Sequence, residues 1–134
     1  MKHAFTPVQL STIEDDGLLS VIEGKRHVPF DIKRVYFIYH AVAGLDRGHH
    51  AHKKAHQAIF CIRGRFTLVL DDGHNRRSYR ISNPDRGMEI PPRVWHEMKD
   101  MSRDTILLVV ASDYYKESDY IRNYRQFLCY IKRK

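Results

Sequence analysis

Histidines gather in one stretch of the chain, Arg47 to Gly64. Four of them fall within eight residues: His49, His50, His52 and His56. Successive side chains of a β-strand point to opposite faces, so His50 and His52 would share one face. The apolar run 58–62 follows, and Gly64 ends it. This pattern predicts a strand that carries two imidazoles into a cavity.

Two imidazoles on one strand face are suited to acid–base chemistry. The unperturbed pKa of histidine, roughly 6.5, lets the ring both take up and release protons near neutral pH. Such a pair can act on two adjacent atoms of one ligand. Ordinary strand histidines are the alternative interpretation.

Short strands separated by turns account for most of the remaining chain. We expect strands at 5–10, 18–23, 34–40, 57–62, 65–70, 76–81, 88–91, 94–98 and 105–111. The histidine strand should pair with 57–62, and Gly64 should begin a hairpin. The continuous apolar run 105–111 is typical of a strand buried on both faces. Around ten short strands indicate an all-β sandwich or barrel, in a single domain of residues 1–134.

Two further elements bear on the site. In the segment 34–40, alternation places Arg34 and Tyr36 on one face, opposite Val35 and Phe37. After Ser112 the spacing of apolar residues becomes helical, at Tyr120, Tyr124, Phe127 and Ile131. This predicts one amphipathic C-terminal helix that begins at Ser118 as N-cap and packs on the outside of the sheets. We assign its tyrosines to core packing.

Composition narrows the location and the partners. No stretch approaches the roughly 20 apolar residues that a membrane span needs, and the N-terminus has no signal-peptide core, so we expect a cytoplasmic protein. Cys61 and Cys129 are expected to be reduced core residues. The net charge of +7 favours an anionic partner. A nucleic acid is disfavoured because no aromatic-basic stacking motif is present. A small phosphorylated ligand fits a few guanidinium groups.

Two motifs resemble those of the cupin superfamily, a small jelly roll. The first contains His50, His52, Gln57 and Gly64, and the second is GMEIPPRVWH, which ends at His96. The metal-binding form of this pattern has a glutamate at the place of Gln57, and a neutral amide is a poor ligand for a divalent transition metal. The resemblance still leaves open a three-histidine metal site of His50, His52 and His96. Three segments narrow the resemblance: RGHHAHKKAHQ, PPRVWHEM and ASDYYKESDYIRNYRQF. Together they are similar to the 3,4-ketoisomerases of nucleotide-linked 4-keto-6-deoxy sugars. This resemblance implies a metal-free enzyme without a cofactor, acting on dTDP-4-keto-6-deoxyglucose, and a homodimer that exchanges N-terminal strands.

The same resemblance implies roles for the site residues. His52 would be the base at carbon, and His50 would move a proton between the two sugar oxygens. Tyr36 would hydrogen-bond a sugar oxygen, and Gln57 would contact the substrate. Candidates for the diphosphate are Arg34, Arg47 and Lys53, although period two places Lys53 opposite the histidines. Apart from the resemblance, Glu97 and Asp113 could either orient a catalytic ring or satisfy backbone donors.

The resemblance also addresses the stereochemistry at C4 of the product. In this family the positions of Asp16 and His96 influence whether C4 is protonated to give the galacto or the gluco sugar. His96 resembles the galacto-forming members, whereas Asp16 resembles neither group. We therefore expect a 3-keto-6-deoxygalactose product. Two alternatives stay open, a metal-dependent cupin enzyme and a non-catalytic cupin that binds a nucleotide sugar.

Overall fold

The structure, a computed structural model, describes residues 5–42 and 44–133. Residues 1–4, 43 and 134 of the predicted domain lie outside this part. The described elements are β1 (Pro7–Gln9), β2 (Ser11–Glu14), β3 (Leu18–Val21), β4 (Arg34–Ile38), β5 (Arg47–His52), β6 (Gln57–Arg63), β7 (Phe66–Asp71), β8 (Arg76–Ile81), β9 (Arg86–Ile90), β10 (Trp95–Lys99), β11 (Ile106–Ala111), a 3₁₀ turn (Glu117–Asp119), β12 (Tyr120–Ile121) and α1 (Tyr124–Ile131).

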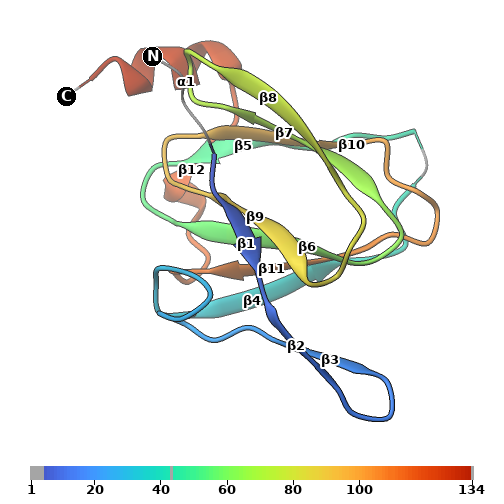
Figure 1. The fold of residues 1–134 in the computed structure, drawn as a ribbon. Helices are drawn as coiled ribbons and strands as arrows, with labels where there is room; N and C mark the ends of the chain where they lie inside the picture. The colour runs from blue at the N-terminus through green and yellow to red at the C-terminus, as the bar shows by residue number, and fades with distance from the viewer. Residues whose placement is uncertain (1–4, 43, 134) are drawn as a thin grey trace.

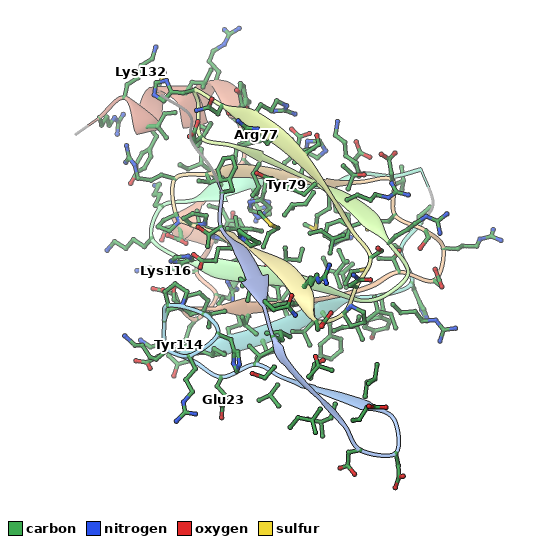
Figure 2. The ribbon with its side chains drawn as sticks, viewed as in Figure 1. Glu23, Arg77, Tyr79, Tyr114, Lys116 and Lys132 are labelled. Carbon is green, nitrogen blue, oxygen red and sulfur yellow. The ribbon has the colours of Figure 1, made fainter. Side chains whose placement is uncertain are left out.

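Two antiparallel five-stranded sheets face each other (Figure 1). One has the strand order β1-β9-β6-β11-β4, and the other has the order β12-β5-β10-β7-β8. Side chains fill the space between them, while Lys116, Lys132 and Glu23 project from the outside (Figure 2). Ile59, Phe66, Leu68 and Leu107 are fully buried there. The all-β cupin jelly roll predicted from the sequence is confirmed.

Strand β11 lies inside its sheet, between β6 and β4. Val109 is the register partner of Ile59 on one side and of Tyr36 on the other. Four of the six residues of β11 are buried, as the apolar run predicted. The alternation predicted for β4 is also confirmed over 34–38, where Val35 and Phe37 are exposed and Tyr36 is partly buried. The register therefore holds Tyr36 on the inner face of its sheet.

Two strand pairings expected from the sequence are wrong. The histidine strand β5 pairs with β10 and β12, whereas β6 pairs with β9 and β11 in the other sheet. Gly64 does not begin a hairpin either, because β6 and β7 belong to different sheets. Gly64 instead turns the chain from one sheet to the other with φ +80, and a Cβ there would lie 2.8 Å from the Cα of Thr105. A sharp corner and a tight hairpin turn both need glycine, so they look alike in sequence. The β7–β8 hairpin is present.

A β-bulge in β5 aims the histidines. His50 is the register partner of His96, and Gly48 is the partner of Glu97, so His49 is the extra residue. Gly48 and His49 both have positive φ, 88° and 57°. A bulge of this kind bends the strand and increases its twist, which redirects the side chains that follow. The direct register partnership also brings His96 next to His50 across the strands.

The C-terminal helix is shorter than predicted. It begins at Tyr124, with the side chain of Asn123 accepting a hydrogen bond from the backbone N–H of Gln126 at 2.9 Å, so Asn123 and not Ser118 is the N-cap. Tyr120 lies on β12 instead, paired with β5. The predicted packing is confirmed, because Phe127 is buried against Trp95 on the outer face of the second sheet. Cys129, however, is exposed.

The hairpin of β2 and β3 projects from the body of the barrel (Figure 1). Asp16 lies at its tip, in a turn with φ 50°. Ile13, Leu18 and Leu19 on this hairpin are exposed. Within the described residues, no helix has both the length and the apolar character needed to cross a membrane.

We predict that Gly48→Ala lowers the free energy of unfolding by about 1–3 kcal/mol, since a side chain at this φ is strained. Steric contact adds to the loss, because the new Cβ would lie 2.9 Å from the carbonyl oxygen of His96. Chemical denaturation measures the change. The matched control is Gly44→Ala, at φ +86 with nothing within 4 Å of the new Cβ. Equal losses in the two variants would show that the bulge imposes no contact penalty.

Candidate active site

Three imidazoles meet on the inner face of the second sheet. His50 and His52 come from β5, and His96 comes from β10. The ring centroids of His50 lie 5.1 Å from His52 and 4.4 Å from His96. His52 and His96 are only 2% and 1% exposed. The prediction that His50 and His52 share one inward face is therefore confirmed by the geometry, and His96 joins them.

Each ring of the β5 pair is held at its Nδ1 atom. Nδ1 of His50 lies 3.1 Å from the carbonyl oxygen of Gly48, in the bulge. Nδ1 of His52 lies 3.1 Å from Oδ2 of Asp119. Both partners accept hydrogen bonds, so each neutral ring donates from Nδ1 and keeps its lone pair on Nε2. The Nε2 atom of His52 is buried and has no partner among the described residues.

Burial keeps these rings uncharged. It lowers the pKa of His50 to about 4, against a weaker opposing effect of the hydrogen bond to Gly48. Burial also lowers the pKa of His52, although Asp119 works in the other direction. For His96, which is enclosed, burial lowers the pKa well below the ordinary value. Near neutral pH the cluster therefore presents neutral imidazoles, the form that accepts a proton.

Tyr36 and Gln57 form the opposite wall, on β4 and β6 of the first sheet. The Nε2 atom of Gln57 donates to the phenol oxygen of Tyr36 at 3.0 Å. Burial raises the pKa of Tyr36 to about 12, so the phenol stays protonated. Because Gln57 occupies the oxygen as a donor, the phenol proton is left to bond a ligand oxygen.

The predicted diphosphate residues are not all brought together. The guanidinium of Arg34 lies 5.2 Å from the ring of Tyr36 and 5.8 Å from that of Tyr115. Arg47 is near enough to Tyr36 to lower its pKa slightly. The ammonium of Lys53 is turned away and lies over the ring of Tyr130, at 5.8 Å. Period two separates it from the histidines, as the sequence indicated.

Asp16 also lies away from the imidazoles of its own chain, at the tip of the projecting hairpin (Figure 1).

Four buried polar atoms near the cluster have no hydrogen-bond partner in the described protein: Arg34 Nε, His52 Nε2, Gln57 Oε1 and His96 Nδ1. An unpaired buried polar group costs roughly 1–3 kcal/mol. Their concentration at one place is typical of a site that binds a polar ligand.

Comparison with known proteins gives the family. A family model described as FdtA: WxcM-like, C-terminal, matches residues 3–132. The chain belongs to this FdtA family. A curated relative, TDP-4-oxo-6-deoxy-alpha-D-glucose-3,4-oxoisomerase of Aneurinibacillus thermoaerophilus, is 44% identical over 119 residues, which cover 89% of this chain and 86% of the relative.

Solved structures of the QdtA sugar 3,4-ketoisomerase of Thermoanaerobacterium thermosaccharolyticum are also similar to this FdtA-family chain. The complex of QdtA with TDP has 40% identity and a TM-score of 0.93, covering 98% of this chain and 97% of QdtA. A histidine-to-asparagine variant of QdtA in complex with TDP-4-keto-6-deoxyglucose has 38% identity and a TM-score of 0.94, covering 100% and 98%.

Three functional candidates in this FdtA-family chain escaped the sequence analysis: Asp119, Tyr120 and Arg122. The ring of Tyr120 lies 4.4 Å from His52 and 4.9 Å from His50, so it covers the pair. The guanidinium of Arg122 lies 4.3 Å from the ring of Tyr120. The helical spacing of the tyrosines predicts that Tyr120 belongs to the C-terminal helix, whereas it lies on β12 beside His52. All three candidates lie inside the segment ASDYYKESDYIRNYRQF, so that resemblance was the available signal.

Glu97 and Asp113, the carboxylates that could orient a ring, accept hydrogen bonds from other side chains. Glu97 accepts from Nε1 of Trp95 at 2.9 Å and from Arg76 at 3.0 Å, on the outer face of β10. Asp113 accepts from the hydroxyl of Ser112.

A metal ion could be held by His50, His52 and His96, whose nearest ring nitrogens lie within 4.8 Å of one another. Gln57 adds no carboxylate to that donor set, and its amide bonds Tyr36.

We predict that protonation of His50 destabilises the fold in acid. Its pKa is about 4 when folded and roughly 6.5 when unfolded, so the unfolded chain binds more protons between these values. Stability is therefore complete above pH 6.5 and falls as the pH drops, by about 3 kcal/mol at pH 4.

Urea unfolding at pH 7 and pH 4 measures this loss in the wild type and in His50→Asn. The variant should lose about 3 kcal/mol less than the wild type between the two pH values. His74→Asn, in the exposed β7–β8 turn, is the matched control and should follow the wild type. Parallel curves for the wild type and His50→Asn would contradict the prediction.

Proposed function

We propose that the protein is a sugar-nucleotide 3,4-ketoisomerase whose substrate is TDP-4-keto-6-deoxyglucose. The observation that carries this proposal is the pair of neutral imidazoles of His50 and His52, held side by side inside the barrel by acceptors at Nδ1. The named activities of the curated relative and of QdtA support it. The QdtA variant that holds the keto sugar carries a changed histidine, which supports histidine chemistry.

The reaction balances without an oxidant or a reductant. Nε2 of His52 takes the proton from C3, which the neighbouring C4 ketone makes acidic, and the electron pair of that bond forms a C3–C4 double bond. The C4 oxygen gains a proton and the C3 oxygen loses one, and His50 carries it between them. The protonated His52 then gives a proton to C4, which leaves a C3 ketone and a C4 hydroxyl and returns the ring to its neutral form. Each step needs a base that is neutral at working pH, as buried imidazole is.

The other residues of the site bind the sugar nucleotide and polarise its sugar oxygens. The phenol of Tyr36 donates a hydrogen bond to a sugar oxygen, which stabilises the negative charge that develops in the enediol intermediate. Arg34 and Arg47, beside Tyr36, pair with the diphosphate, since guanidinium groups match phosphate oxygens. Gln57 fixes Tyr36 through the 3.0 Å hydrogen bond. Tyr120 and Arg122 close the site over the histidines.

We predict that His52→Asn and His50→Asn fail at different steps. The substrate is incubated in deuterated water with each variant and followed by NMR. His52→Asn should neither exchange the C3 hydrogen nor move the carbonyl, with kcat reduced at least about 10³-fold and ligand binding kept. His50→Asn should exchange C3 with solvent but leave the carbonyl at C4.

The exposed His74→Asn is the control and should match the wild type. Native turnover by His52→Asn would refute the assignment of the base. Carbonyl transfer by His50→Asn at the native rate would refute the proton shuttle.

We further propose that C4 is protonated to give the galacto product. His96 supports this, because its ring lies 4.4 Å from that of His50, the residue proposed to move the proton between the sugar oxygens. The reaction run in ordinary water and followed by NMR reads the outcome, because the product then carries hydrogen at C4, and its coupling to the hydrogen at C5 distinguishes an axial from an equatorial hydroxyl. A gluco product would overturn this part and leave the isomerase intact.

A metal-dependent cupin enzyme is the second candidate, favoured by the closeness of the three histidines. It predicts stoichiometric iron, manganese or zinc in purified protein and loss of turnover after chelation. A binding module without catalysis predicts thermal stabilisation by TDP and no isomerised product. The isomerase proposed here predicts full turnover after treatment with a chelator.

The surface supports a homodimer in which N-terminal strands are exchanged. The β2–β3 hairpin exposes Leu18 at 78%, and an isolated two-stranded hairpin is marginally stable in water. Strand β4 is an edge of its sheet and exposes Val35 and Phe37. A hollow of about 500 Å³ adjoins this edge, lined by Phe37, Tyr39 and Ile106 among others. A partner's hairpin laid along β4 would cover both apolar surfaces and satisfy the free edge.

We predict that Leu18→Asp and Phe37→Asp each convert a dimer to a monomer, because each places a carboxylate in the apolar contact. Light scattering coupled to size-exclusion chromatography measures the mass. Ser82→Asp, which adds the same charge in the exposed turn between β8 and β9, should remain dimeric. A monomeric wild-type protein would contradict the exchange.

A further inference from the structure

Several hydrogen bonds to the backbone hold Asp119 in place. It lies at the end of the 3₁₀ turn that precedes β12, next to β5 (Figure 1). Its Oδ1 accepts from the backbone N–H of Lys54 at 2.7 Å, and its Oδ2 accepts from that of Ala55 at 3.3 Å. Its carbonyl oxygen accepts from the N–H of Lys53 at 2.8 Å. The carboxylate is therefore fixed against the end of the histidine strand.

The carboxylate of Asp119 also contacts the proposed base. Oδ2 lies 3.1 Å from Nδ1 of His52, where the carboxylate is 13% exposed and the imidazole 2%. A carboxylate only accepts hydrogen bonds, so the neutral ring must carry its proton on Nδ1. The lone pair is then on Nε2, the buried atom without a partner. The contact chooses which nitrogen of His52 can act as a base.

His50 has a weaker partner. The carbonyl oxygen of Gly48 fixes the same tautomer, but it carries only a partial charge. A carboxylate stabilises the imidazolium that forms when the ring accepts a proton, by charge as well as by the hydrogen bond. The two imidazoles of β5 therefore differ in how strongly their Nδ1 partners stabilise the protonated ring.

We propose that Asp119 is a positioning residue that holds His52 as the Nδ1–H tautomer and thereby makes His52 the carbon base of the pair. This inference rests on the proposed isomerase activity. It assigns the division of roles between the histidines to a residue 67 positions away in the chain. Gly48 gives His50 the orientation without the charge, which suits a group that passes a proton between two oxygens.

The two oxygen atoms of Asp119 have different partners. Oδ1 accepts from the backbone N–H of Lys54 at 2.7 Å, whereas Oδ2 accepts from His52 at 3.1 Å and from the backbone N–H of Ala55 at 3.3 Å. Asp119→Asn can keep its oxygen on Lys54 and place its NH₂ group toward His52. That group donates, so it would bind the lone pair of Nδ1 and force the ring proton to Nε2. One substitution therefore removes the base and keeps the 2.7 Å hydrogen bond from Lys54, while the longer 3.3 Å bond from Ala55 is lost.

Nitrogen-15 NMR of the free, chelator-treated protein reads the tautomer of His52 directly, and steady-state kinetics read the consequence. Wild-type His52 should be protonated at Nδ1, and Asp119→Asn should shift it to Nε2. We expect kcat to fall between about 10²-fold and 10⁴-fold with KM within about twofold, since losses of this size follow removal of a carboxylate behind a catalytic histidine. Asp104→Asn removes an exposed carboxylate bonded to Ser102 and should change neither quantity.

Three outcomes overturn the proposal: an unchanged His52 tautomer, a kcat within about threefold of wild type, or a loss of stability that accounts for the whole loss of activity. Urea unfolding of Asp119→Asn tests the last of these. The NMR measurement needs no substrate, so it judges the positioning role by itself. A wild-type protein that shows the expected tautomer and no isomerisation would disprove the proposed function and leave the role of Asp119 in fixing the ring.

Discussion

The burial of uncharged imidazoles between two sheets is the constraint on which the site depends. A histidine in contact with water would be partly protonated near its ordinary pKa and would lose its usefulness as a base as the pH falls. Burial lowers the pKa of His50 to about 4 and that of His96 well below the ordinary value. The barrel therefore sets the protonation state, and the partners at Nδ1 set the direction of each lone pair.

This constraint explains local features of the scaffold. Packing alone would not require a strand to include Gly48 and His49 at positive φ, which disturbs the ladder. The bulge turns the carbonyl of Gly48 toward His50 and leaves His50 directly opposite His96. On the other side of the cavity, Gln57 stands where a carboxylate would favour a metal, and it bonds the phenol of Tyr36. The inner face therefore carries an amide at this position, and that amide orients the phenol of Tyr36.

The interior of the barrel also contains buried polar atoms without a hydrogen-bond partner among the described residues. A side chain such as Gln57 is fully buried, yet its Oε1 has no partner among the described residues. Buried polar groups without a partner reduce the stability of the fold, and proteins retain them where they bind a ligand. The apolar core formed by residues such as Ile59, Phe66 and Leu107 offsets that cost nearby.

Local alternation was enough to determine part of this protein from its sequence. Period two placed His50 beside His52 and turned Tyr36 inward, because side-chain direction in a strand depends on adjacent residues alone. Sequence could not decide that β5 and β6 belong to different sheets, or that Tyr120 leaves the helical pattern to pair with β5. Only the tertiary structure brought Asp119 to His52, because a contact between residues 67 positions apart is decided by how the strands pair and leaves no periodic trace in the chain.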